Sequence, residues 1–225
     1  MKTGPWYRYD FSEDSDYLIV GFGSVRMFVD RSNNKGWEWD NTFKYKFTDF
    51  KFNKMFVGDI YNSWWHTTYE GLSGHGPLIL KDYLLEKIKE SGATKTLYLG
   101  VSMGGYGALL FGCLTGATKV MAFSPQTMLS KKYRIKKKLN EKFKPYKIDE
   151  SLTDLKQVLE EHENNKTKYH IWRGEKNSSD VLASERLSHI KNVFIHSVAT
   201  KKHNPIIPVI RSGVFKEEVN KFFTS

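Results

Sequence analysis

The sequence predicts an α/β fold with a mostly parallel sheet and helices on both faces. Short apolar runs typical of buried strands alternate with longer segments of helical spacing through most of the chain. Such alternation favours parallel strands joined by helical crossovers. A chain of 225 residues can bury one large core, so we expect a single domain over residues 1–225.

The expected strands are short apolar runs bounded by polar or glycine-rich turns. The first covers residues 16–23 and ends in G-F-G, which indicates a tight turn after a buried strand. There is little room for strands before Tyr17, so the sheet looks shortened. The remaining expected strands are residues 52–57, 96–100, 119–123, 169–172 and 193–198.

The clearest expected helix covers residues 77–91. Pro77 suits a first helical turn, leucines recur at helical spacing, and Gly92 follows as a stop signal. The other expected helices are residues 104–115, 152–163, 181–190 and 215–223.

The net charge of +10, from 35 Lys plus Arg against 25 Asp plus Glu, raises the alternative of a nucleic-acid or anionic partner. Much of the excess lies in a basic insertion or cap at about residues 128–150, with K-K-Y-R at 131–134 and K-K-K at 136–138. This run lacks aromatic residues interleaved as in a binding module, so nucleic-acid binding is the weaker alternative. The charge is also compatible with an anionic substrate.

Other features of the sequence exclude whole classes of protein. The single cysteine, Cys113, excludes a disulfide framework within the chain. We find neither a metal-ligand cluster nor a phosphate-binding glycine motif, and we expect no metal and no cofactor. No signal-peptide-like segment and no apolar stretch of membrane-span length occurs, so we expect a cytoplasmic protein.

The segment G-V-S-M-G at residues 100–104 carries the chemistry. It fits G-x-S-x-G and lies between an expected strand and an expected apolar helix, the context in which a serine nucleophile stands on a sharp turn. Gly100 and Gly104 are small, as the close passage of strand and helix requires. We therefore expect Ser102 to be a nucleophile, although a glycine-rich turn with an idle serine fits the same pattern.

A serine nucleophile needs a histidine base and an acid, in the chain order Ser, acid, His. His203 follows the last expected strand in a loop, where this architecture places its base. Asp180 and Glu175 both follow the preceding strand. We prefer Asp180, because the following helix can hold it, although it also suits a helix first turn.

The expected oxyanion hole uses two backbone N–H groups. One belongs to Met103, directly after the serine, and the other to Phe22 in the loop G-F-G-S at residues 21–24. Gly23 would let the substrate approach this loop. Asp59, Trp64 and Gln126 follow strand ends and are candidates to line the substrate site, with Trp65 and His66 beside them; core packing of the tryptophans and helix capping by Gln126 are the alternatives.

The chain resembles an α/β-hydrolase of the short kind found beside bacterial glycan and capsule biosynthesis genes, over about residues 17–223. The matching segments are G-F-G at 21–23, F-V-G-D at 56–59 followed by W-W at 64–65, G-V-S-M-G-G-Y-G-A-L at 100–109, A-F-S-P-Q-T at 122–127, Asp180 and His203. The resemblance implies a Ser-His-Asp enzyme without a large lid domain.

These observations predict a serine hydrolase that cleaves an acyl ester or thioester through an acyl-enzyme. A small-molecule or glycan-linked acyl compound is the expected substrate. The same residues would serve an acyltransferase if a sugar or alcohol replaced water. A non-catalytic binding protein that uses its basic surface is the alternative from another class.

Overall fold

The computed structural model describes residues 1–11, 14–24, 50–129 and 148–224. The strands in these ranges are β1 (Lys2–Thr3), β2 (Tyr7–Asp10), β3 (Tyr17–Phe22), β4 (Asn53–Val57), β5 (Lys95–Val101), β6 (Lys119–Phe123), β7 (Lys168–Gly174) and β8 (Val193–Val198). The helices are α2 (Pro77–Ser91), α3 (Met103–Thr115), the 3₁₀ turn η2 (Glu150–Leu152), α5 (Leu155–Glu161), α6 (Ser178–Glu185), α7 (Ile206–Arg211) and α8 (Val214–Phe223).

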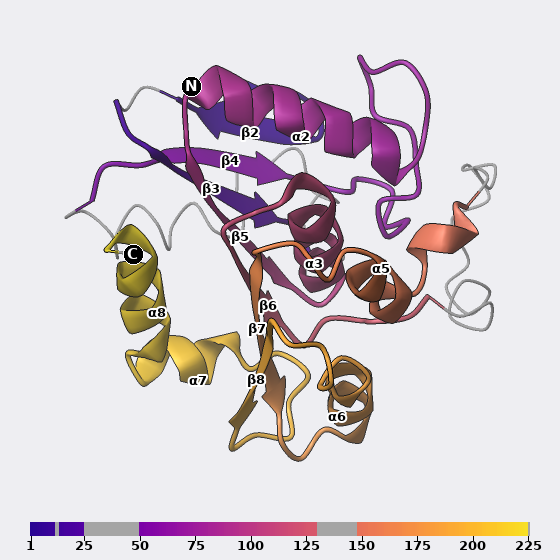
Figure 1. Cartoon of the computed structure of the whole chain (residues 1–225), viewed down its shortest axis with the longest axis vertical. Helices are drawn as coiled ribbons and strands as arrows, with labels where there is room; N and C mark the ends of the chain where they lie inside the picture. Colours follow the sequence, from indigo (N-terminus) through magenta and orange to yellow (C-terminus); the bar gives the residue numbers. More distant parts are fainter. Residues whose placement is uncertain (12–13, 25–49, 130–147, 225) are drawn as a thin grey trace.

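The strands form one sheet in the order β1-β2-β4-β3-β5-β6-β7-β8, which Figure 1 shows running through the middle of the molecule. The pairs from β4 through β8 are parallel, whereas β1 and β2 add to the β4 edge in antiparallel fashion. The predicted α/β class with a mostly parallel sheet is therefore confirmed.

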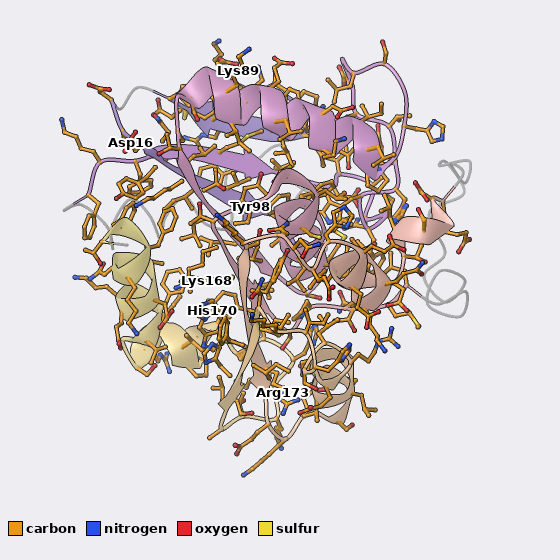
Figure 2. The ribbon with its side chains drawn as sticks, viewed as in Figure 1. Asp16, Lys89, Tyr98, Lys168, His170 and Arg173 are labelled. Atoms are coloured by element: carbon orange, nitrogen blue, oxygen red, sulfur yellow. The ribbon has the colours of Figure 1, made fainter. Side chains whose placement is uncertain are left out.

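Both faces of the sheet are covered, because successive strand residues point to opposite sides. On β5, Leu97 and Leu99 join an apolar cluster with the C-terminal helices, while Tyr98 joins the cluster that contains α3. Figure 1 shows α7 and α8 on the opposite side of the sheet from α2, α3 and α5, and Figure 2 shows Tyr98 near the centre of the molecule. The Thr115 hydroxyl at the end of α3 donates to the buried Tyr98 oxygen over 3.0 Å.

Two parts of the predicted fold differ from the structure. The expectation of little room for strands before Tyr17 is wrong, because β1 and β2 precede it and Tyr7 pairs with Val57 of β4. Each is too short for periodicity to signal it. Helix α7 was not expected, since Pro208 lies within it; the proline falls in the first turn, where no helical N–H bond is needed.

Other boundaries shift by a few residues. Helix α6 begins at Ser178, three residues before the expected start at Val181, because the Asn177 side chain accepts the Asp180 backbone N–H and caps it. The helix expected over residues 152–163 is α5 preceded by the turn η2.

The arrangement of β3, β4 and β5 fixes where a site can form. Strand β3 pairs with β4 on one side and with β5 on the other, so the chain changes direction across the sheet at this point. Phe22 at the end of β3 is in register with Gly100 of β5. The carboxyl ends of β3 and β5 therefore lie together, and ligands of open α/β sheets bind at such a switch point.

The predicted basic insertion or cap at about residues 128–150 mostly lies outside the described residues, which exclude 130–147. At its borders, Met128 forms an isolated antiparallel bridge with Asp154 just before α5. Across the described ranges, no helix is both long enough and apolar enough to cross a bilayer.

Candidate active site

Ser102 occupies a sharp turn between β5 and α3. Its backbone has φ 55° and ψ −115°, a conformation that residues with a side chain rarely adopt. The turn is anchored on both sides: the Ser102 N–H donates to the Phe123 carbonyl over 2.8 Å, and its own carbonyl accepts the Tyr106 N–H over 3.0 Å. The predicted strand–serine–helix context is therefore present, and the serine is held in a strained backbone geometry.

The two glycines that flank the serine are sterically required. A Cβ at Gly100 would lie 1.9 Å from the carbonyl oxygen of Gly104, and a Cβ at Gly104 would lie 2.3 Å from the carbonyl oxygen of Phe22. Both distances are far below van der Waals contact. The backbones of β3, β5 and α3 can meet behind Ser102 only because these positions lack side chains.

His203 joins Ser102 to Asp180. Its Nε2 lies 2.9 Å from Ser102 Oγ, and its Nδ1 lies 2.8 Å from Asp180 Oδ1. An ionised carboxylate can only accept, so Nδ1 carries the proton and Nε2 is left to accept the serine O–H. The Asp180 side chain is 5% exposed and the His203 side chain 45% exposed, so the acid is buried and the imidazole faces solvent.

The sequence left Asp180 and Glu175 as alternative acids, and the geometry separates them. Asp180 lies in the first turn of α6, and Asn177 holds that turn by accepting its backbone N–H. Glu175 is exposed, and its backbone N–H donates to the Val198 carbonyl. The sequence analysis overlooked Asn177, although an Asn before a helix is a recognisable capping signal.

The loop that carries His203 packs against the end of β7. A Cβ at Gly174 would lie 2.8 Å from the Thr200 carbonyl oxygen and 2.9 Å from that of Lys202. The Lys176 N–H also donates to the Thr200 carbonyl over 3.1 Å. The absence of a side chain at Gly174 therefore lets the histidine loop lie close enough to reach both Asp180 and Ser102.

Of the two expected oxyanion donors, Met103 is well placed and Phe22 is not. Met103 is the first residue of α3, where backbone N–H groups have no intrahelical partner. Phe22 ends β3 and lies within the ladder between Val57 and Gly100, so its backbone N–H points into the sheet. Its side chain is fully buried, and its carbonyl faces Gly104.

The expectation that Gly23 lets a substrate approach the loop stays a prediction, but Gly23 does not replace Phe22 as an oxyanion donor. Its backbone N–H donates to the Val57 carbonyl over 2.9 Å and is therefore not available to a substrate. Residues 25–49, which follow shortly after Gly23, lie outside the described part of the chain.

Asp59, expected to line the site, is instead the organiser of the loop after β4. Its side chain is 1% exposed, and its carboxylate accepts the backbone N–H groups of Tyr61, Ser63 and Trp65 over 3.1, 2.6 and 2.9 Å. Desolvation raises the pKa of Asp59, and these hydrogen bonds oppose the shift. The carboxylate is thus committed to the loop, and it acts on the site only through the residues that the loop carries.

That loop places two tryptophans differently. Trp65 is fully buried, packs edge-on against Phe22, and donates its indole N–H to the Met103 carbonyl over 3.2 Å. Trp64 donates its indole N–H to Gln126 Oε1 over 3.3 Å, and Gln126 Nε2 lies 3.3 Å from Ser102 Oγ. Trp65 is thus a core residue, whereas Gln126 lies next to the serine and Trp64 lies next to Gln126. His66 is buried against the Tyr106 hydroxyl.

A cavity of about 410 Å³ opens beside the histidine and the acid. Met128 and Leu182 are exposed large apolar side chains, so part of the lining of this cavity is apolar. The sequence analysis did not identify them, because an exposed apolar residue carries no local signal. The lining residues are Pro125, Gln126, Thr127, Met128, Ser179, Asp180, Leu182, Ala183, Arg186 and His203.

Other nucleophilic or basic side chains are engaged elsewhere. Cys113 is buried, and desolvation raises the pKa of its thiol to about 11, so it is not a ready nucleophile. His170 and His196 stack on each other on β7 and β8, and His189 contacts Glu160 over 2.7 Å. His203 is the histidine that the structure brings to Ser102.

No protein-family model matches the chain, and no curated protein matches it by sequence. Solved structures do. The capsule O-acetyltransferase of Neisseria meningitidis serogroup A has a TM-score of 0.70 at 17% identity, over 95% of this chain and 90% of that one. A carboxylesterase of Nitrososphaera gargenis gives 0.59 at 10% identity, over 97% and 95%. MGS-M2, an α/β-hydrolase enzyme from a deep-sea metagenome library, gives 0.58 at 15% identity, over 98% and 94%.

The chain has the α/β-hydrolase fold. These identities are too low to carry more than the fold. The resemblance to short α/β-hydrolases is thus confirmed at that level, and the neighbours with this fold include both esterases and an acetyltransferase of capsule.

Proposed function

We propose that the chain is an acyl-transfer enzyme that works through an acyl-serine at Ser102, with an ester or thioester as the acyl donor. The observation that carries the proposal is the position of His203, which lies 2.9 Å from the serine oxygen and 2.8 Å from a buried carboxylate. A serine on a strained strand-to-helix turn, with a base in reach and an acid behind that base, is the arrangement that activates a hydroxyl.

The proposed reaction has two halves. The Ser102 oxygen attacks the acyl carbon while its proton moves to His203 Nε2, and His203 then gives that proton to the departing alcohol or thiol. In the second half, His203 takes a proton from water or from an acceptor hydroxyl, whose oxygen attacks the acyl carbon and releases Ser102. Asp180 keeps the imidazole in the required tautomer and stabilises its cation in both halves.

For the oxyanion, we propose the Met103 N–H as one donor, supported by its position at the start of α3. Phe22 and Gly23 both use their N–H groups within the sheet, so neither is proposed as the second donor.

Transfer to an acceptor hydroxyl is the second candidate, with a glycan as the acceptor class. The structures with this fold include a capsule O-acetyltransferase, of which a variant has been solved in complex with CoA. The cavity lined by His203 and Gln126 also supports it, because an acceptor must reach the histidine that takes its proton. Its size leaves room for more than a water molecule.

The first experiment tests the acyl-serine itself. The purified chain is incubated with a fluorophosphonate probe and with p-nitrophenyl acetate, alongside Ser102→Ala and His203→Gln. We expect stoichiometric labelling of the wild type, none of Ser102→Ala, and slow labelling of His203→Gln. Labelling that persists in Ser102→Ala contradicts the proposal. An unlabelled wild type that binds an oligonucleotide in a salt-sensitive manner favours the alternative of a binding protein.

A second experiment separates hydrolysis from transfer. The acyl-enzyme is formed from acetyl-CoA or p-nitrophenyl acetate, and products are followed as an oligosaccharide acceptor is added. For a transferase, the acceptor raises the rate of CoA or nitrophenol release and becomes acetylated. For a hydrolase, acetate remains the product and the release rate does not respond to the acceptor.

A further inference from the structure

The side chain of Gln126 lies between the nucleophile and a buried indole. Its Nε2 donates to Ser102 Oγ over 3.3 Å, and its Oε1 accepts the Trp64 indole N–H over 3.3 Å. Ser102 Oγ therefore has two neighbours, Gln126 on one side and His203 Nε2 on the other at 2.9 Å. The roles proposed above for the triad and for the oxyanion donors do not include the Gln126 side chain.

The indole decides which way the amide faces. An amide can present either its oxygen or its NH₂ to a neighbour, but an indole N–H only donates. Trp64 therefore fixes Oε1 toward itself and turns the NH₂ group toward Ser102. Because the serine oxygen then receives a hydrogen bond from Gln126, its single O–H is left to donate to His203 Nε2. That is the direction in which the proton must leave.

The backbone around Gln126 is fixed on both sides of the side chain. Ser124 adopts a left-handed φ of 45°, and its N–H donates to the Trp172 carbonyl over 2.8 Å. The Thr127 hydroxyl donates to the Ala183 carbonyl over 2.7 Å. Pro125 packs against the helix α3 at Gly105, where an added Cβ would lie 3.2 Å from it. A strained bend held by three separate contacts is characteristic of functional positions.

The position of Trp64 is also fixed by its surroundings. Its side chain is 6% exposed and its backbone has φ 52°. The neighbouring Ser63 and Trp65 N–H groups both donate to the Asp59 carboxylate, which keeps the loop in this conformation. Asp59 thus fixes the backbone on both sides of Trp64, and the Trp64 indole bonds the amide that meets the serine oxygen.

We propose that Gln126 is a further catalytic residue of this site, which directs the Ser102 proton to His203 and stabilises the charge on Oγ, and that Trp64 is its positioning residue. The inference rests on the proposed acyl-serine function. When Ser102 attacks, its proton passes to His203 Nε2 and its oxygen forms the bond to the acyl carbon. Gln126 donates to that oxygen while the proton leaves it, and the negative charge then passes to the former carbonyl oxygen. The same bond acts when the acyl-oxygen bond breaks and Oγ recovers its proton.

The test compares three variants. Gln126→Leu removes the donor at similar size, and Gln126→Glu replaces it with an acceptor that competes with His203 for the serine proton. Trp64→Phe removes the fixing N–H and keeps an aromatic ring, although a smaller one. A donor to developing charge is worth about 100- to 1000-fold in well-formed oxyanion holes, and this bond is longer, so we expect a loss of about 10- to 100-fold for Gln126→Leu. Gln126→Glu should lose more, and Trp64→Phe less.

The readouts are the rate constant of fluorophosphonate labelling and the kcat and KM for p-nitrophenyl acetate. We expect labelling and kcat to fall together with little change in KM. Gln157→Leu, an exposed surface glutamine, and Trp6→Phe, which removes a buried indole N–H from the Glu70 carbonyl, are matched controls. Neither should change the labelling rate, although Trp6→Phe should lower stability.

A double-variant cycle separates positioning from structural damage. If Trp64 acts only through the amide, Trp64→Phe has no further effect on labelling in the Gln126→Leu background. The inference is overturned if Gln126→Leu labels at the wild-type rate, or if the effect of Trp64→Phe is undiminished in that background. An unlabelled wild type, or a labelled Ser102→Ala, refutes the proposed function and the inference with it, whereas a labelled wild type with an unaffected Gln126→Leu overturns the inference alone.

Discussion

The backbone strain at Ser102 predicts that Ser102→Gly will be more stable than Ser102→Ala. With φ 55° and ψ −115°, Ser102 sits where residues other than glycine rarely lie, at a cost of about 1–3 kcal/mol. Ser102→Gly and Ser102→Ala both remove the hydroxyl, but only glycine removes the Cβ that conflicts with this conformation. Their difference in stability therefore isolates the strain.

The expected size of the difference follows from two opposing contributions. Glycine relieves the strain, and it lowers stability by about 0.5–1 kcal/mol through the greater freedom of the unfolded chain. Ser102→Gly should therefore be more stable than Ser102→Ala by about 1–2 kcal/mol, which for a chain of this size is roughly 2–8 °C in Tm. Both variants should lack fluorophosphonate labelling.

The assay is equilibrium unfolding in urea, followed by tryptophan fluorescence, with a thermal melt as a second measurement. The slope of the urea transition should be equal for the two variants, so that the midpoints compare stabilities directly. The reasoning is refuted if Ser102→Gly is no more stable than Ser102→Ala, because the turn would then hold no strain that a glycine can release.

Three further predictions follow from contacts around the site and the sheet. Gly104→Ala should lower stability by about 1–3 kcal/mol and reduce esterase activity, because its Cβ would lie 2.3 Å from the Phe22 carbonyl oxygen; an unchanged urea midpoint would contradict this. Asp59→Asn should lower stability by about 2 kcal/mol, since an amide can accept fewer of the N–H groups that the carboxylate now holds; wild-type stability would show that the loop does not need the charge. Burial lowers the pKa of His170 to about 4, so between that pH and about 6.5 the unfolded chain binds this proton more readily than the folded chain does. The free energy of unfolding should therefore rise with pH across this window by at most about 3 kcal/mol. In His170→Phe the urea midpoint should depend less on pH there, and a pH dependence equal to that of the wild type would show that the imidazole does not contribute.

Much of the fold could be predicted from sequence because its core strands and main helices carry strong local patterns. Helix α2 matches residues 77–91 and ends at Gly92 in the left-handed conformation with φ 70°. Strands β6 and β8 also match their expected ranges. What escaped prediction depends on partners distant in sequence: β2 is a strand because Tyr7 finds Val57, which no local signal announces.

The candidate site likewise has a part that the sequence predicted and a part that it did not. Ser102, Asp180 and His203 follow strand ends in the order that the motif implies, and the structure brings their side chains together. The expected backbone donor Phe22 failed, because the sequence shows where a glycine turn begins but not which N–H groups the sheet has already used. The proximity of Trp64 and Gln126 to the serine depends on two strained bends, whose direction the residue types alone do not fix.

The histidine depends on the outermost strand of the sheet. In the described part of the chain β8 pairs only with β7, and His203 lies just beyond its end, whereas Ser102 follows the central strand β5. An edge strand opens more readily than a central one, so the base can detach by local unfolding while the nucleophile stays in place. Catalysis would then sample only the molecules whose edge is closed, and turnover would report the opening equilibrium of a single strand long before the protein as a whole unfolds.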